Sequence, residues 1–116
     1  MSEKIFELLK NIPAMVTAHG EGKKQVFLGY NDTATAITQF AYGVFEPGEK
    51  CSTHVHATMD ECFFFLKGEG TYTVGENVYA LQPYSFLRIP AGTPHELQAG
   101  GSGTLEFVYF GVASDK

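Results

Sequence analysis

The sequence has few basic residues and no long apolar run, and each shortage argues against a class of protein. Eight lysines and arginines stand against thirteen aspartates and glutamates, which gives a net charge of -5, and the lysines are scattered. Because nucleic-acid-binding surfaces neutralise phosphates with clustered positive charge, we expect no nucleic-acid partner. The longest apolar stretches, such as residues 63–66, are far shorter than the roughly 20 residues that cross a bilayer. We therefore expect no membrane association.

Targeting signals and cysteines are also scarce. The first ten residues lack the apolar core and the small-residue cleavage site of a secretory signal, so the sequence predicts a cytoplasmic protein. Cys51 and Cys62 can form at most one disulfide, and neither their number nor their spacing indicates a disulfide framework or a CxxC redox pair. We expect two reduced thiols.

The sequence does contain enough apolar material for one hydrophobic core. Its 116 residues are 44% hydrophobic and 18% charged, a balance that is typical of a globular chain. That length suits one domain rather than two. We expect a single domain over residues 1–116, with an N-terminal arm at 1–20 and a β-barrel at 25–112.

One short helix and about eight strands are predicted. Apolar residues recur at helical spacing behind Ser2, an N-cap candidate, and Pro13 ends the segment, so residues 3–10 are predicted to be helical. The rest consists of short β-branched and aromatic runs between turn residues, which is typical of an antiparallel sandwich or barrel. The predicted strands are 25–30, 35–45, 51–56, 61–67, 71–74, 78–81, 86–89 and 104–112.

Three of the four histidines lie between positions 54 and 95. His54 and His56 are two positions apart, so on a strand both imidazoles point to one face, about 7 Å apart along the backbone. Two imidazoles in an apolar interior would lose hydration without compensation, which favours a shared cation. Glu61 opens the next aromatic strand, and a rigid turn at 90–94 precedes His95. His19, in a polar loop, is expected to be structural or exposed.

The spacing around these residues resembles the first motif of the cupin family. Gly48, five residues, His54-Val55-His56, four residues, Glu61, six residues and Gly68 reproduce that motif completely. The resemblance implies that the two histidines and the glutamate are metal ligands.

A second cupin motif is matched less completely. Pro90, Gly92 and His95 are similar to its core, and the resemblance implies that His95 is the fourth ligand. Tyr84 stands where that motif begins with glycine, and Ala99 where it ends with asparagine. Neither departure affects a ligand. The resemblance implies an all-β jelly-roll barrel, also described as a double-stranded β-helix.

The implied ligand set indicates one divalent transition metal per chain. Nitrogen and carboxylate ligands together suit iron, manganese, nickel, cobalt or zinc, and four protein ligands leave roughly two octahedral positions for other molecules. Because cupins include dioxygenases, isomerases, decarboxylases, lyases and proteins that only bind ligands, the resemblance implies no single reaction. We expect a metal-dependent enzyme acting on a small oxygen-rich molecule, by dioxygenation, isomerisation or elimination. The alternative is a binding or sensor protein without turnover.

Candidate ligand-contacting residues follow from strand alternation. If Glu61 faces inward, Phe63 and Phe65 share its face and line the cavity, although core packing alone accounts for both. Tyr72 is expected to face inward as well, as a substrate contact and a candidate proton donor. Cys51 precedes the first site histidine by three residues, which gives it the opposite parity, so it should not be a ligand unless the strand carries a bulge.

The residues between these positions are expected to face outward. Asp60 and Arg88 are predicted to lie on the surface. Phe64 and Leu66 would form an apolar stripe that a soluble monomer rarely exposes, which predicts a homodimer. The alternative is that apolar side chains of the arm, at 5–9, cover this stripe within one chain.

Overall fold

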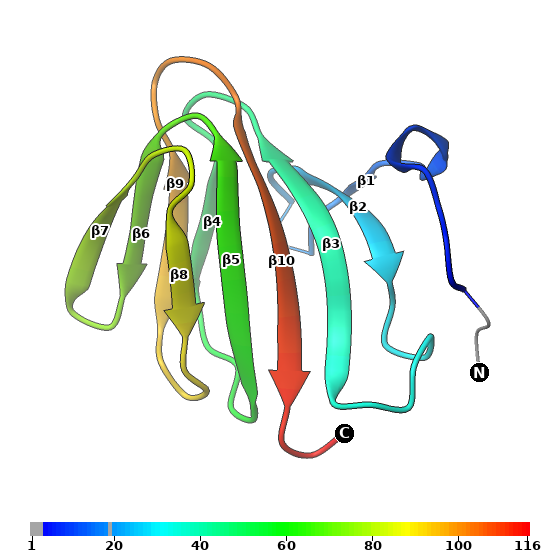
Figure 1. Cartoon of the computed structure of the whole chain (residues 1–116). Coiled ribbons are helices and arrows are strands. Elements are labelled where there is room, and N and C mark those ends of the chain that lie inside the picture. Colours follow the sequence, from blue (N-terminus) through cyan, green and yellow to red (C-terminus); the bar gives the residue numbers. More distant parts are fainter. Residues whose placement is uncertain (1–3, 19) are drawn as a thin grey trace.

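The computed structural model describes residues 4–18 and 20–116, which fold almost entirely into strands (Figure 1). His19 lies outside the described residues. The elements are η1 (Leu9–Asn11), β1 (Met15–Val16), β2 (Lys23–Leu28), β3 (Ile37–Phe45), β4 (Lys50–His54), β5 (Met59–Lys67), β6 (Gly70–Val74), β7 (Asn77–Leu81), β8 (Phe86–Ile89), β9 (His95–Ala99) and β10 (Leu105–Ala113).

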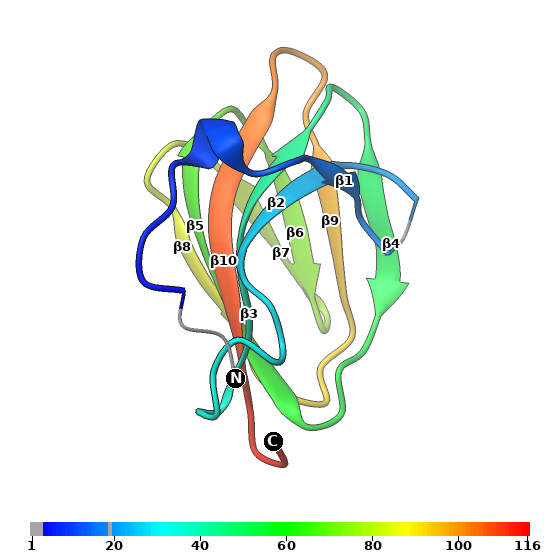
Figure 2. The same cartoon turned by 90° about the vertical axis from the view of Figure 1, so that its right-hand side faces the viewer.

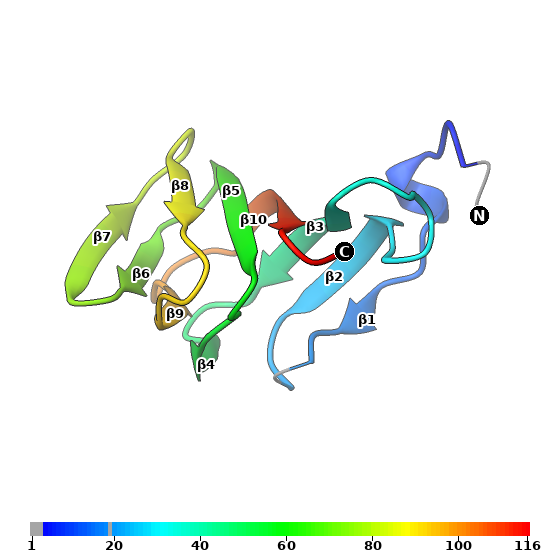
Figure 3. The same cartoon turned by 90° about the horizontal axis from the view of Figure 1, so that it is seen from below.

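The strands form two antiparallel sheets. One has the order β1-β2-β3-β10-β5-β8, and the other has the order β4-β9-β6-β7. Seen from below, β7, β6, β9 and β4 make one layer, and β8, β5, β10 and β3 make the other (Figure 3). The all-β prediction is confirmed, but among the described strands no ladder joins one sheet to the other. The fold is thus a two-sheet sandwich and not a closed barrel.

The core lies between the sheets and is rich in aromatic rings. Phe65 and Phe107 are almost fully buried, and their ring centroids are 5.2 Å apart. Phe63 packs on Phe107 from the same strand as Phe65, with centroids 5.7 Å apart. Alternate residues of β5 and β10 supply these rings, as the two-residue period requires. Burial of each ring contributes roughly 1.5–3 kcal/mol.

The predicted helix at 3–10 is wrong for the residues that the structure describes. Residues 4–8 are not helical, and only the 3-10 turn Leu9–Asn11 forms. An eight-residue helix is marginal without packing, and Ile5 and Phe6 are 94% and 79% exposed. The Gln25 side chain instead donates to the carbonyls of Leu9 and Ile12, at 2.9 and 2.8 Å. The arm therefore lies beside β2 (Figures 1 and 2), and it leaves the Phe64 stripe on β5 uncovered.

Two strands were missed by the sequence prediction. The short β1 pairs with β2, and β9 pairs with both β4 and β6. The β9 sequence alternates buried and less buried residues, but it contains no β-branched or aromatic side chain, which is the composition that marks strands. Pairing with β4 and β6, and not the composition of its own residues, thus makes β9 a central strand of the second sheet.

Two turn positions explain how the chain relates to the expected motifs. Gly68 has a φ of 91°, and a Cβ there would overlap the Thr104 carbonyl group. Tyr84, which stands where the second motif has glycine, also has a positive φ, 72°. Left-handed conformations cost a non-glycine residue about 1–2 kcal/mol. At Tyr84 a 2.7 Å hydrogen bond from its amide to the Phe65 carbonyl and ring stacking on Phe64 help to hold this conformation.

Candidate metal centre

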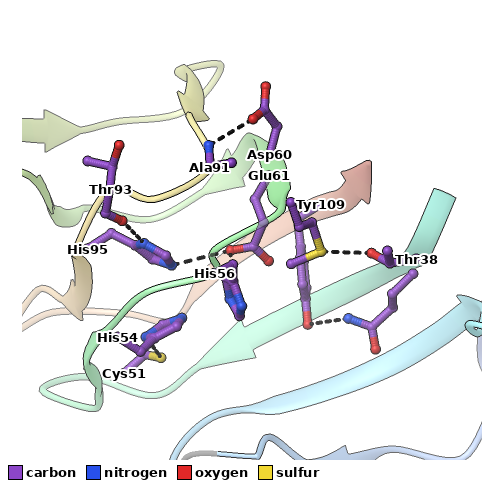
Figure 4. Close-up of polar contacts among 12 residues, drawn as sticks. Thr38, Cys51, His54, His56, Asp60, Glu61, Ala91, Thr93, His95 and Tyr109 are labelled. Carbon is purple, nitrogen blue, oxygen red and sulfur yellow. Dashed lines mark hydrogen bonds and ion pairs between the residues drawn. The ribbon is translucent and has the colours of Figure 1, made fainter. Parts of the chain in front are cut away.

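The three histidines and Glu61 converge at the end of the sandwich where both sheets meet (Figure 4). His54 ends β4 and pairs directly with His95, the first residue of β9. Glu61 comes from β5 in the other sheet. His56 lies in the loop after β4, because the strand ends at His54 and not at residue 56, where the sequence predicted its end. We call this group, His54, His56, Glu61 and His95, the metal centre.

The donor atoms of the metal centre are close enough to share one ion. One ligand atom from each residue lies within 4.8 Å of all the others. Glu61 Oε1 is 3.4 Å from His56 Nε2 and also 3.4 Å from His95 Nε2. Glu61 and His95 are buried, whereas His54 and His56 are partly exposed. The centre is therefore anchored in the core and open on one side.

Backbone hydrogen bonds orient two of the imidazoles. The Nδ1 atoms of His54 and His95 lie 2.8 Å from the carbonyls of Ser52 and Thr93. A carbonyl can only accept, so each Nδ1 carries the proton and Nε2 is the nitrogen able to coordinate. Such bonds to the second nitrogen are the usual support of metal-ligating histidines.

His95 Nε2 is the strongest indication that these residues fit a metal. It is buried and makes no hydrogen bond, and it faces the Glu61 carboxylate. In the neutral imidazole its lone pair would oppose a carboxylate oxygen, an arrangement that requires a proton or a cation between them. A divalent ion satisfies both atoms, so the four residues fit the metal that the sequence motifs imply.

His54 and His95 respond differently to their surroundings. Burial lowers the pKa of His54, and the neighbouring histidines add to this effect. Burial also acts to lower the pKa of His95, but the Glu61 carboxylate and the bond to the Thr93 carbonyl outweigh it and raise that pKa. Without metal, His54 is thus neutral at neutral pH, whereas His95 holds a proton more tightly. A metal that coordinates His95 must displace that proton.

A cavity of about 180 Å³ opens beside the metal centre. This volume is below the range of about 300–1,000 Å³ that is typical of pockets for drug-sized ligands, so the cavity suits a small molecule. Its apolar walls include Phe63, Leu97 and Phe107. Tyr72 also lines it. Phe65 shares the inward face of β5 but is fully buried in the core and is not among the cavity-lining residues.

The structure adds cavity residues that sequence reasoning missed. Cys51 lines the cavity, and the β4–β9 register shifts between Cys51 and His54, which is the irregularity that the parity argument allowed for. Tyr109, on β10, lines the cavity with its ring stacked on Phe63, the centroids 5.1 Å apart. Phe107 and Tyr109 are two positions apart on a predicted strand, so both point to one face, and this alternation was the sequence signal that could have identified Tyr109. Lys24 and Gln39 also line the cavity.

Burial keeps the two cavity tyrosines protonated. Burial and the charge of Glu61 raise the pKa of Tyr72 well above its usual value. Burial, followed by the charge of Glu61, also raises the pKa of Tyr109. Both hydroxyls are therefore hydrogen-bond donors and not phenolates across the physiological pH range.

Comparisons with known proteins agree with this architecture. Residues 41–111 match a family model described as the cupin domain. A predicted oxalate decarboxylase from Thermotoga maritima superposes with a TM-score of 0.87 at 18% identity, over 94% of this chain and 99% of that one. The polyketide cyclase RemF from Streptomyces resistomycificus gives a TM-score of 0.77 at 17% identity, over 97% and 80% of the chains.

A third structure, KdgF from Halomonas sp., gives a TM-score of 0.76 at 15% identity and covers 96% of both chains. These identities establish a shared fold and nothing more. No curated protein matches the sequence significantly. In the part of the chain that the structure describes, no helix is long and apolar enough to span a bilayer.

Proposed function

The chain belongs to the cupin domain family, and from this premise we propose that it is a metal-dependent enzyme for a small oxygen-rich molecule. In this proposal the metal centre binds one divalent transition metal per chain. Four protein ligands leave roughly two octahedral positions for the substrate or for dioxygen. The reaction is a dioxygenation, or an isomerisation or elimination that needs no oxygen.

The observation that carries the proposal is the buried His95 Nε2. It has no hydrogen bond and belongs to a set of four donors that lie within 4.8 Å of one another. This atom lies 3.4 Å from Glu61 Oε1, and a divalent ion between the two would satisfy both, whereas an unpaired buried polar group costs about 1–3 kcal/mol. Two of the similar structures are described as enzymes, a predicted oxalate decarboxylase and a polyketide cyclase, which supports a catalytic use of the fold.

The chain's own residues would bind and shield the substrate. A bound divalent ion would supply Lewis acidity that polarises a carbonyl or carboxylate oxygen. Phe63 and the other apolar walls exclude water from the cavity, which strengthens electrostatic interactions inside it. Tyr72 contributes a protonated hydroxyl at the cavity wall, suited to donate a hydrogen bond to a substrate oxygen.

Metal analysis tests the first part of the proposal. Purified protein should contain close to one divalent ion per chain, since convergent ligands on a folded scaffold hold a cation tightly. His56→Ala should lower the metal content sharply, whereas His19→Ala, in the polar loop that the sequence places away from the ligand motifs, should leave it unchanged. Equal metal content in the two variants would contradict the ligand set.

A substrate screen separates catalysis from binding. Enediols, β-dicarbonyls and sugar derivatives should be incubated with the iron, manganese, nickel and zinc forms under air and under nitrogen. Loss of substrate only under air indicates a dioxygenase, and loss under both indicates an isomerase or lyase. Reversible binding without turnover in every metal form would favour the alternative, a binding or sensor cupin, and would remove the catalytic role of Tyr72.

A further inference from the structure

Three polar side chains form a hydrogen-bonded row in the cavity wall. Lys24 Nζ on β2 donates to Gln39 Oε1 on β3 at 2.8 Å. Gln39 Nε2 donates to the hydroxyl oxygen of Tyr109 on β10 at 3.5 Å (Figure 4 shows Tyr109 and this bond). All three line the same cavity as the metal centre, and none belongs to the metal-ligating set. We call Lys24, Gln39 and Tyr109 the polar row.

The direction of these hydrogen bonds leaves donors facing the cavity. An ammonium group can only donate, so Lys24 fixes the amide oxygen of Gln39 toward itself. The amide nitrogen then faces Tyr109 and also can only donate, so the Tyr109 oxygen accepts. The Tyr109 proton is therefore not used within the row. Lys24 likewise has three N–H donors and gives one of them to Gln39.

Tyr72 adds another unused donor to the same cavity. It is 2% exposed, it lines the cavity, and its hydroxyl forms none of the side-chain hydrogen bonds found among the described residues. Unlike the polar row, it lies on β6, which belongs to the other sheet. Two walls of the cavity thus present hydroxyl protons that an acceptor on a ligand can satisfy.

The charges that line the cavity also indicate a ligand that accepts hydrogen bonds. Of the described lining residues, Lys24 is basic and Glu61 is acidic, and His54 and His56 of the metal centre also line the cavity. Glu61 Oε1 lies 3.4 Å from Nε2 of both His56 and His95, and a divalent ion shared by these ligands would offset its charge. The Lys24 ammonium would repel a ligand amine, whereas it would attract a carboxylate.

We propose that the natural ligand is a small carboxylate anion, which places its carboxylate against Lys24 and Tyr109 and its other oxygens at the metal centre. This inference rests on the proposed function, because it assigns a ligand class to the same site. Gln39 acts as a positioning residue that orients Lys24 and keeps the Tyr109 proton available. Lys24 and Tyr109 determine specificity for the carboxylate group.

Isothermal titration of zinc-loaded protein with two small probes tests the proposal. Malonate carries two carboxylates, whereas acetylacetone offers two oxygens to a metal but has no carboxylate. Lys24→Met should weaken malonate binding by about tenfold or more, since hydrogen bonds to charged groups are worth about 1.5–3 kcal/mol. The Kd of acetylacetone should stay within about twofold, because its contacts are confined to the metal centre.

Two further variants distinguish a designed contact from general electrostatics. Gln39→Glu preserves the shape of the row but neutralises Lys24 and accepts the Tyr109 proton, so it should also weaken malonate binding without weakening acetylacetone binding. Lys67→Met is the matched control. It removes the same charge from an exposed lysine that pairs with Glu106, outside the cavity, and it should bind malonate like the wild type.

The outcomes separate this inference from the proposed function. Equal malonate affinity in Lys24→Met and Lys67→Met overturns the inference, as does an equal loss for both probes in Lys24→Met or a wild type that binds no malonate. Metal content, measured on the same samples, reports on the metal centre independently. If the wild type takes up no metal, the proposed function fails, whereas Lys24-dependent malonate binding by metal-free protein would still support the carboxylate contact.

Discussion

Glu61→Gln should abolish most of the stabilisation that metal gives to the fold, whereas Asp60→Asn should abolish none of it. The two substitutions remove one carboxylate charge each from adjacent positions of β5. Glu61 faces the metal centre. Asp60 faces outward, where it pairs with Arg88 and accepts a 2.8 Å hydrogen bond from the Ala91 amide. Comparing the two variants therefore separates the effect of where the carboxylate points from the effect of losing one negative charge.

The expected magnitude follows from ligand linkage. Free metal at about 1,000 times the wild-type Kd stabilises the folded state by about 4.1 kcal/mol. Loss of a group that supports a ligand weakens metal binding by about 10–100-fold, so loss of a charged ligand should weaken it by at least about 100-fold. The same metal concentration is then about 10 times the new Kd and gives about 1.4 kcal/mol. At about 4 °C per kcal/mol for a domain of this size, the metal-induced rise in Tm falls from about 16 °C to about 6 °C.

Thermal unfolding followed by circular dichroism, with and without a chelator, measures this quantity. Each variant is compared with its own metal-free form, so the loss of the Glu61 contacts to the histidines does not enter the difference. Asp60→Asn should reproduce the wild-type rise. Equal metal-induced rises in the two variants would refute the assignment of Glu61 as a ligand, and a wild type whose Tm does not respond to any divalent metal would refute the metal centre itself.

Three further predictions concern the rest of the molecule. Gly68→Ala should destabilise the protein by about 3 kcal/mol in urea unfolding, from left-handed strain and backbone overlap together. Gly48→Ala, whose Cβ would meet open space, should cost only about 1 kcal/mol. Equal costs for the two variants would contradict the close approach of the Thr104 backbone to Gly68. The hydrogen bond from Tyr42 lowers the pKa of Glu106 below its usual value of 4.5. The stability advantage of the wild type over Tyr42→Phe should therefore be present above pH 4.5 and be lost as pH falls through the lowered pKa. An advantage that persists in strong acid would show that the Glu106 carboxylate is not its source. Phe64→Glu should convert a homodimer into a folded monomer in light scattering, because Phe64 is 39% exposed on the uncovered stripe, and a wild type that is monomeric at high micromolar concentration would remove this proposal.

The part of the site that sequence spacing could predict is the part built from nearby residues. His54 and His56 are two positions apart, and Glu61 follows on the next strand, so local geometry limits where their side chains can point. The family resemblance added His95, and the structure brings it to the other three. The cupin family itself is confirmed by the family model.

The part that could not be predicted depends on long-range register. Cys51 faces the cavity because of a bulge, and a one-residue shift reverses every side chain of a strand. Lys24 and Gln39 lie beside Tyr109 only because β2, β3 and β10 are neighbours in one sheet, which their own sequences do not reveal. The helix prediction at 3–10 failed for a related reason, since helical spacing does not supply a surface for a short helix to pack against.

The position of β10 has a consequence for how the chain folds during synthesis. This strand is the last of the described elements, yet it lies between β3 and β5, with which it forms two long antiparallel ladders. Until residues 105–113 leave the ribosome, β3 and β5 are both edge strands, and their apolar inner faces lack a partner. Such non-local pairing is slow to form. The nascent chain is therefore most vulnerable to aggregation before β10 emerges, and the emergence of β10 completes the principal sheet in one step.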